Sequence, residues 1–345
     1  MKKFGILFLV LISLLRSGYA EEGMQQRINR NQNRSQVAPL EKKLFTATLK
    51  DRFPLNSRAF HIILQAPEIP YTPGSVIAIY PENPKEKVDA ILKILGDETL
   101  REYLTKEVDL DRVPEGMARA PDLLSSLEKS PLRASELPKL LPLRHRYYSI
   151  ASSKETTPGE IHLTVVTFIT EKNGHQAPGL CSNFLCREIS LGKKLTCHIP
   201  DKKKFSPPED PIPPVIMISS GAAIAPFRGF MQERSTIPSK NWLIHGGRTK
   251  KDDFYYKEEW QKLIASGHLK ITTAFSRDQE EKIYVQDKIK EEAEEFLKWI
   301  DDGAIIYICG NSKKMVEDVT ASLADILGGE EHIDVLRKSK RLFPQ

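Results

Sequence analysis

The chain has 345 residues, 40% hydrophobic and 28% charged, which is enough for two globular domains of ordinary size. Its 51 Lys and Arg are interspersed with 46 Asp and Glu, so the net charge of +5 gives little support for nucleic-acid binding and stays compatible with docking to a small acidic protein. Its four cysteines show neither paired C-x-x-C spacing nor a matching histidine pair, so we expect no metal site and no disulfide scaffold.

Residues 1–43 are predicted to be a signal-like or disordered leader. Two lysines precede an apolar run at residues 4–15, and small residues follow, a pattern similar to a secretory signal. The run is too short for a membrane-spanning helix, and a polar stretch follows Met24. Arg16 directly after the run, and the use of a reduced nicotinamide cofactor expected below, argue against secretion. We therefore expect translation to begin at Met24 and the protein to be cytoplasmic. Export or membrane tethering through residues 1–20 is the alternative.

The next part of the chain, residues 44–210, has the punctuation of a β domain. Short apolar runs at 44–49, 59–64 and 76–80 are broken by proline and glycine, and strand character returns at 145–152, 161–168 and 194–199. Helical spacing between about 84 and 141 predicts a small helical insertion. Six such strands predict an antiparallel β-barrel interrupted by helices.

Five prolines between residues 207 and 214 predict a linker, and beyond it strands and helices alternate through residues 211–345. This alternation predicts an α/β domain with a doubly wound parallel sheet, in which ligands bind at the carboxyl ends of the strands. The predicted strands are 215–219, 242–246, 270–275 and 304–309, and the predicted helices are 226–233, 254–265, 285–300 and 313–327. Candidate residues follow three of the four strands.

The barrel part contains Arg146-Tyr147-Tyr148-Ser149, which combines a permanent cation, an aromatic face and a hydroxyl. Arg146 can hold a phosphate, Tyr148 can stack on a flavin ring, and Ser149 can hydrogen-bond near flavin N5. A strand with an exposed Arg, a core Tyr and a surface Ser explains the same pattern. Downstream, backbone amides at a helix start near Gly179 and Ser182 suit a pyrophosphate, although a common helix cap looks alike.

In the α/β part, Gly221 follows an apolar strand in a turn suited to a nucleotide. The third strand is followed by two cations, a hydroxyl, a ring and an amide, at Ser276, Arg277, Lys282, Tyr284 and Gln286. A 2′-phosphate needs Arg or Lys where an NAD site has an acidic residue, and Tyr284 can face an adenine, so NADPH is favoured over NADH. A solvated, charged loop is the alternative.

Cys309 ends the fourth predicted strand, in Ile306-Tyr307-Ile308-Cys309-Gly310. A buried cysteine is usually a small hydrophobic residue. Beside the other candidates, Cys309 is expected to lie where a nicotinamide ring meets the flavin.

From about residue 44 to 336, the chain resembles the FAD- and NADPH-binding half of the diflavin reductases, within the ferredoxin-NADP reductase superfamily. The likeness is closest to the flavoprotein subunit of bacterial sulfite reductase. It is carried by residues 71–74, 146–153, 214–233, 275–286 and 302–310.

The resemblance implies two cofactor sites. FAD is expected to bind through Arg146, Tyr147, Tyr148, Ser149, Thr164, Val165, Val166, Gly179, Leu180, Cys181 and Ser182. NADPH is expected to bind through Gly221, Ala222, Arg248, Ser276, Arg277, Lys282, Tyr284, Gln286 and Asp318. In the family, the residues matching Ser149 and Cys309 assist hydride transfer from nicotinamide to flavin. Thr170 stands where relatives often carry a Tyr over the adenine.

Three departures from the family modify these expectations. The Gly-Thr-Gly-Ile-Ala-Pro turn reads Gly-Ala-Ala-Ile-Ala-Pro here, so Ala222 lacks a hydroxyl and Ala223 adds a methyl where backbone approaches pyrophosphate. Phe343 is the nearest counterpart of the terminal aromatic that covers the flavin in relatives. The residues before the barrel leave no room for an FMN domain, so electrons are expected to pass to a separate carrier.

Two hypotheses result. The first is an NADPH-dependent FAD reductase that delivers electrons to a flavodoxin, an FMN protein or a sulfite reductase haemoprotein. The second is a degenerate flavin-binding or assembly protein that keeps the fold without turnover.

Overall fold

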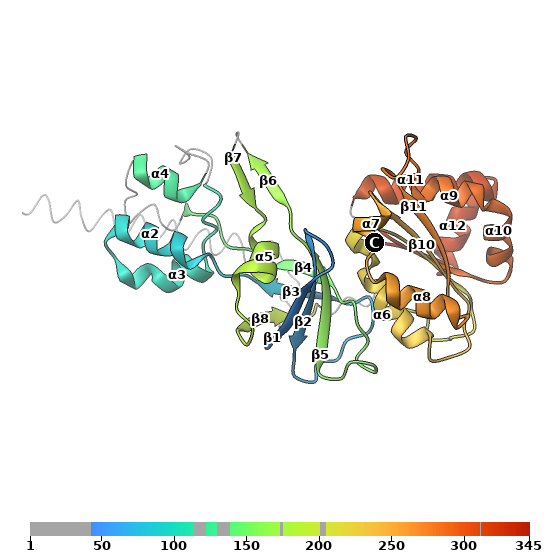
Figure 1. Cartoon of the computed structure of the whole chain (residues 1–345), viewed down its shortest axis with the longest axis horizontal. Helices are drawn as coiled ribbons and strands as arrows, with labels where there is room; N and C mark the ends of the chain where they lie inside the picture. Colours follow the sequence, from blue (N-terminus) through green and yellow to red (C-terminus); the bar gives the residue numbers. More distant parts are fainter. Residues whose placement is uncertain (1–42, 114–121, 130–138, 173–174, 201–204, 311) are drawn as a thin grey trace, which may run out of the picture. The chain divides into compact units, whose positions relative to one another are not determined.

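The computed structural model describes residues 43–345 except 114–121, 130–138, 173–174, 201–204 and 311 (Figure 1). The predicted leader, up to residue 42, and parts of the predicted helical insertion lie outside the described residues. Within the described part, no helix is both long and apolar enough to cross a membrane.

The first sheet is antiparallel and has six strands in the order β4-β3-β8-β1-β2-β5. Its strands are β1 (Phe45–Pro54), β2 (Ala59–Gln65), β3 (Val76–Tyr80), β4 (Arg146–Ser149), β5 (Glu160–Val166) and β8 (Lys194–His198). A bridge between Ile150 and Leu163 joins the two edges, and the Ala151 N–H donates to the His162 carbonyl at 2.8 Å. The predicted antiparallel barrel is therefore confirmed.

Strand alternation gives β5 two different faces. Ile161, Leu163 and Val165 are fully or almost fully buried in the barrel core. Between them, Glu160, His162 and Thr164 point out of the barrel, where the latter two meet the helices of the second domain. The outward face of β5 thus becomes part of a domain interface.

The described part of the helical insertion contains α2 (Lys85–Leu95), η1 (Glu98–Leu100), α3 (Arg101–Lys106) and α4 (Leu123–Lys129). These helices share a small core of their own that includes Val88, Ile91, Leu104 and Leu127. A hairpin of β6 (Ile169–Lys172) and β7 (His175–Pro178), which the sequence pattern did not predict, precedes α5 (Leu180–Asn183) and a π-helical turn, η3 (Phe184–Glu188).

The second sheet is parallel, with the order β11-β10-β9-β12-β13. Its strands are β9 (Val215–Ser220), β10 (Asn241–Gly247), β11 (Lys270–Phe275), β12 (Ile305–Cys309) and β13 (Leu342–Pro344). Its helices are α6 (Ala225–Arg234), α7 (Lys250–Asp253), α8 (Lys257–Ala265), α9 (Val285–Glu291), α10 (Ala293–Asp301), α11 (Lys313–Leu327) and α12 (Glu330–Lys338). The predicted doubly wound domain is confirmed.

Both faces of this sheet are covered by helices (Figure 1). One face packs Phe227 and Phe230 of α6 and Trp260 of α8, and the other packs side chains of α9, α10, α11 and α12. The single helix predicted over 285–300 is two helices, because the chain breaks at Glu292. The Glu292 carboxylate accepts hydrogen bonds from Lys270 and Thr272, which fixes the break against β11.

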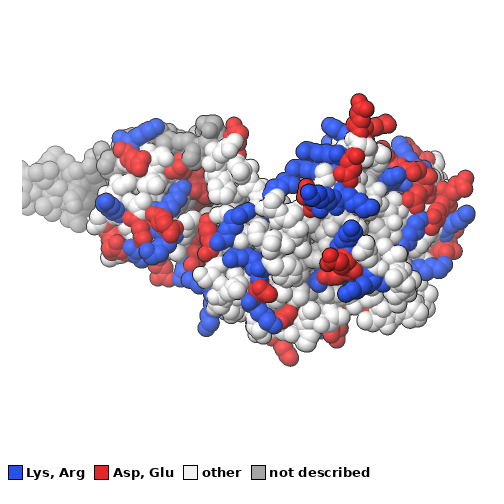
Figure 2. Space-filling model, in the orientation of Figure 1, with Lys and Arg blue, Asp and Glu red and all other residues white. Residues whose placement is uncertain are grey.

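Figure 2 shows that Lys and Arg are mixed with Asp and Glu over the face in view. This distribution agrees with the modest net charge of the sequence.

Candidate functional site

A cavity of about 900 Å³ is lined both by the barrel and by the carboxyl-terminal edge of the parallel sheet. From the barrel it receives Tyr148, Thr164, Val166 and Phe168, and from the α/β domain it receives the loops after β9, β10 and β11. Twelve of the predicted residues meet there: Tyr148, Thr164, Val166, Gly221, Ala222, Arg248, Ser276, Arg277, Lys282, Tyr284, Gln286 and Asp318.

The α/β side of the cavity follows from strand order. Because β9, β10 and β11 are parallel and in register, Ser220 pairs with Gly246 and Gly247 pairs with Phe275 at one edge. After β9 the chain turns at Gly221, whose φ of 56° is in the region that favours glycine, and enters the short helix η4 (Gly221–Ile224). The strand ends therefore place three loops around one hollow.

Hydrogen bonds fix these loops to one another. The Arg277 N–H donates to the Arg248 carbonyl at 2.7 Å, and Ser276 Oγ donates to the Gly247 carbonyl at 3.3 Å. The Asp253 carboxylate accepts the Arg248 N–H at 2.8 Å. The guanidinium groups and ammonium groups of this wall remain exposed on an ordered backbone.

Four cations line this side of the cavity: Arg248, Arg277, Lys282 and Lys314. Tyr284, at the start of α9, adds a ring that is 44% exposed. Cations and a free aromatic face are the groups that bind the phosphates and base of a nucleotide. This wall fits a phosphorylated dinucleotide.

The barrel side is more apolar. Tyr148 lines the cavity and has its hydroxyl near Cys181, and burial together with that thiol raises the pKa of Tyr148 well above its usual value. Phe168 is 55% exposed, and its ring covers Gly179, where an added Cβ would lie 2.5 Å from the ring. Thr164, Val166 and Phe168 lie at alternate positions, so strand periodicity is a signal that could have predicted Phe168. Two rings and an apolar wall fit a flavin.

The rest of the Arg146–Ser149 strand does not line the cavity. Arg146 is exposed and its Nη1 donates to the carbonyls of Arg144 and His145 at 2.9 and 3.2 Å. Tyr147 is 55% exposed and its hydroxyl contacts the His145 ring. Ser149 is half-buried, and Val165, predicted beside Thr164, lies in the barrel core. Strand alternation sends Tyr147 and Ser149 to the face opposite that of Tyr148, whereas Arg146 is held by hydrogen bonds to its own segment.

The predicted pyrophosphate turn, Gly179, Leu180, Cys181 and Ser182, also lies outside the cavity lining. Gly179 is the N-cap of α5, but the Phe168 ring lies over it. Ser182 Oγ donates to the Gly179 carbonyl at 3.0 Å, which closes the turn on itself. Cys181 is buried, and burial raises the pKa of its thiol to about 11.

Three residues that were expected near the cofactors, Cys309, Phe343 and Ala223, pack in or against an apolar cluster of the α/β domain and do not line the cavity. Cys309 ends β12, as predicted, but it is 6% exposed and burial raises its pKa to about 12. Phe343, expected to be the counterpart of a ring that covers the flavin, instead stacks on Tyr307 with ring centroids 5.1 Å apart. Ala223 packs in the same apolar cluster, whereas Ala222 faces the cavity. The Ala223 methyl therefore does not obstruct the cavity.

The sequence reasoning missed several lining residues, notably Arg58, Tyr255 and Lys314. Lys314 follows β12 at the start of α11, a position that strand-end logic could have identified. Arg58 lies in the turn between β1 and β2, and no pattern in the sequence marks it. Within the described residues, no group of three or more His, Cys, Asp or Glu side chains could hold a metal ion.

Two family models match the chain. An FAD binding domain matches residues 122–184, and an oxidoreductase NAD-binding domain matches residues 217–321. The chain is 33% identical to the sulfite reductase [NADPH] flavoprotein alpha-component of Neisseria meningitidis serogroup C, over 88% of this chain and 59% of the relative. It is 40% identical to that of Vibrio cholerae, over 71% of this chain and 40% of the relative, and 38% identical to that of Vibrio vulnificus, over 77% and 45%.

The fold and these matches identify an FAD-binding domain followed by an oxidoreductase NAD-binding domain. More particularly, the chain is homologous over most of its length to the flavoprotein alpha-component of NADPH sulfite reductase. It spans about three fifths of the Neisseria relative and about two fifths of the Vibrio cholerae relative.

Proposed function

We propose that the protein is an NADPH-dependent FAD reductase, in which residues 44–210 bind FAD and residues 211–345 bind NADPH. The observation that carries this proposal is the shared cavity, where the apolar wall of the barrel meets the cationic strand ends of the parallel sheet. When bound, FAD would accept a hydride from NADPH and return electrons singly to an acceptor.

The residues of each wall have distinct proposed roles. Arg277 and Lys282 hold the 2′-phosphate of NADPH, and Tyr284 faces the adenine. Tyr148 and Phe168 provide rings for FAD, with Arg146 and the turn at Gly179–Ser182 directed to its phosphates. Ser149 and Cys309 stay the proposed residues for assisting hydride transfer.

The electron acceptor is proposed to be a separate protein: a sulfite reductase haemoprotein, a flavodoxin or an FMN protein. The name of the relatives, which describes one component of a sulfite reductase, supports the first. The mixed surface charge is compatible with a docking site that selects its partner through local complementarity.

Anaerobic titration of the FAD-loaded protein tests this function. We expect the purified protein to be yellow, NADPH to bleach the 450 nm region, and ferricyanide to restore it. Protein that does not take up FAD would contradict the proposal. Pull-down followed by reduction assays on the recovered carriers would then identify the acceptor.

A second candidate function is flavin binding without turnover, and one observation favours it. Ser149 and Cys309, the proposed pair for hydride transfer, do not line the cavity. In that case FAD would bind and NADPH would not bleach it. Anaerobic titration with NADPH therefore separates the two candidates, whereas Ala223→Gly should change little in either, since the Ala223 methyl is buried away from the cavity.

A further inference from the structure

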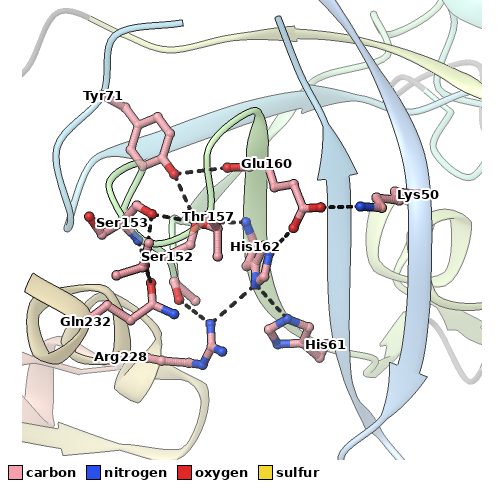
Figure 3. A network of polar contacts seen from close by, with 12 residues as sticks. Lys50, His61, Tyr71, Ser152, Ser153, Thr157, Glu160, His162, Arg228 and Gln232 are labelled. Atoms are coloured by element: carbon pink, nitrogen blue, oxygen red, sulfur yellow. Dashed lines mark hydrogen bonds and ion pairs between the residues drawn. The ribbon is translucent and has the colours of Figure 1, made fainter. Parts of the chain in front are cut away.

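Polar side chains form a hydrogen-bonded path that leads away from the cavity through the domain interface. Figure 3 shows its outer part, from His61 through His162 and Glu160 to Lys50. The path begins at Thr164, which lines the cavity, and ends at Glu160, which lines a separate, solvent-open hollow of about 380 Å³. Both residues lie on the outward face of β5, four positions apart. The links between them are His162 of the same strand, His61 of β2 and Tyr256 at the start of α8.

Every link in this chain is within hydrogen-bonding distance. Thr164 Oγ1 lies 2.6 Å from the Tyr256 hydroxyl, and that hydroxyl lies 2.9 Å from His61 Nδ1. His61 Nε2 lies 3.1 Å from His162 Nδ1, and His162 Nε2 lies 2.9 Å from Glu160 Oε2. Glu160 also pairs with Lys50, whose side chain is 51% exposed. The chain therefore reaches solvent without a gap.

The carboxylate at the outer end gives the chain one direction. Glu160 can only accept, so His162 carries its proton on Nε2 and presents a lone pair at Nδ1. His61 must then donate from Nε2 and accept at Nδ1 from Tyr256, which in turn accepts from Thr164. Both hydroxyls and both rings are thus donors on one side and acceptors on the other, the arrangement that a proton relay needs.

The surroundings keep this arrangement in place. His61, His162 and Thr164 are 2%, 6% and 6% exposed. The Arg228 guanidinium lies over the Tyr256 ring at 5.0 Å and donates to the Ala151 carbonyl at 2.8 Å. Glu259 balances the charge of Arg228 through two hydrogen bonds. Burial and Arg228 lower the pKa of both histidines, so at neutral pH both rings are neutral and neither stores a proton.

The backbone conformation of Tyr256 indicates that the position of its hydroxyl is held by specific contacts. Tyr256 has a φ of 61°, one of two positive values at non-glycine residues in the described part of the chain. An L-residue adopts this region at a cost, and such strain persists where surrounding contacts hold it. Here three contacts of the side chain, to Thr164, His61 and Arg228, hold the hydroxyl between the barrel and the cavity.

We propose that Thr164, Tyr256, His61, His162 and Glu160 form a proton exit from the cofactor cavity to the surface. The inference rests on the proposed function, in which NADPH is converted to NADP⁺, one proton and two electrons, and two one-electron acceptors take the electrons. A nucleotide that fills the cavity would separate its interior from solvent, so the released proton would need another path. A proton reaching Thr164 Oγ1 displaces the next along each link until Glu160 passes one to solvent.

The first experiment measures proton release from FAD-loaded protein. The flavin is photoreduced without NADPH and mixed with ferricyanide, with NADP⁺ present to fill the cavity, and a pH-indicator dye reports the proton. We expect Tyr256→Phe and Thr164→Val to slow proton release at least tenfold, and Thr164→Ser to restore it. Tyr71→Phe is the matched control. It removes a buried hydroxyl that hydrogen-bonds to Ser152 and to the Glu160 carbonyl and is not a link of the proposed relay.

The result that overturns the relay is proton release at the wild-type rate in both Tyr256→Phe and Thr164→Val, or equal slowing in Tyr71→Phe. The Thr164→Val variant keeps the shape of the side chain, so it remains informative if Tyr256→Phe does not fold. Wild-type rates in these variants leave the proposed function intact, because bleaching by NADPH is measured separately.

A second experiment does not need the cofactor. Imidazole ¹⁵N NMR of the cofactor-free protein should show His61 and His162 neutral, each with its proton on Nε2. A proton on Nδ1 of either ring breaks the chain and overturns the relay, whether or not FAD binds. Protein that binds no FAD would contradict the proposed function alone.

Discussion

The two walls of the cavity differ in how directly their residues follow from the sequence. On the α/β wall, Gly221, Arg277, Lys282 and Tyr284 all lie where strand-end logic expects them. On the barrel wall, only Tyr148 of the predicted strand 146–149 reaches the cavity lining, and Phe168, which was not predicted, lies beside it. Parallel strands bring their carboxyl ends to one edge, whereas a barrel strand sends alternate side chains to opposite sides.

The two walls therefore offer different contacts to a ligand. The α/β wall carries its charges on loops whose backbones are pinned by hydrogen bonds. The barrel wall is built from the outer face of β5 and depends on the buried groups behind it. Substitutions on the two walls therefore test different contacts.

The largest expected effect concerns one buried histidine behind each wall, His61 in the barrel and His245 in the parallel sheet. Burial is the main cause that lowers their pKa values, to about 2 and about 4. Between pH 7 and 5 the unfolded chain therefore binds more protons than the folded chain, so stability falls as the pH falls. Each histidine contributes a loss of about 2 kcal/mol over this range.

Urea denaturation at pH 7 and pH 5 measures this loss. His61→Gln and His245→Gln should each reduce the difference between the two pH values by about 2 kcal/mol. His332→Gln, on the exposed surface of α12, is the control and should leave the difference unchanged. An unaltered pH dependence in His61→Gln would show that the barrel wall opens to water before the whole chain unfolds.

Arg277→Ala tests the α/β wall. Loss of a guanidinium that binds the 2′-phosphate should raise the KM for NADPH about 10- to 100-fold and change that for NADH less than about threefold. Steady-state reduction of ferricyanide with each nucleotide gives both values. Lys290→Ala is the matched control, because Lys290 is an exposed cation paired with Asp325 outside the cavity. Equal losses for both nucleotides would place Arg277 at a phosphate that they share.

Phe168→Ala tests the barrel wall. If the ring stacks on FAD, its removal should weaken FAD binding about 5- to 50-fold, measured by fluorescence titration of the apoprotein. Ile169→Ala removes a neighbouring apolar side chain that is 69% exposed and absent from the cavity lining, and should bind FAD normally. Normal binding by Phe168→Ala would leave Tyr148 as the ring of this wall.

The smallest effect is expected for Gly179→Ala. The added Cβ would lie 2.5 to 2.8 Å from three atoms of the Phe168 ring, so the ring must move. Because that ring is half exposed, the free energy of unfolding should fall by less than about 1 kcal/mol. If FAD binding depends on the position of the Phe168 ring, Gly179→Ala should weaken it, as Phe168→Ala does. If binding does not depend on that position, Gly179→Ala should bind FAD normally.

Much of the fold could be predicted from the sequence because its signals are local. The apolar runs of β2, β3 and β9 and the helical spacing of α11 predict their elements within a few residues. The hairpin β6–β7, the helix α12 and the strand β13 were not predicted, since their residues are polar or too few to form a pattern. Pro344 in β13 is tolerated because that strand is at the sheet edge.

Residue types and their order were enough to indicate two nucleotide-binding domains and the charge pattern of an NADPH site. Which side chains share one cavity depended on barrel closure and on the contact between the domains, neither of which has a local signature. The same contact joins His61 and Glu160 of the barrel to Tyr256 of the second domain in one hydrogen-bonded path. His61 and Tyr256 are 195 positions apart in the sequence. This path forms only when strand register and domain packing bring its side chains within hydrogen-bonding distance. The sequence therefore determines which residues are present, and the tertiary structure decides that they meet.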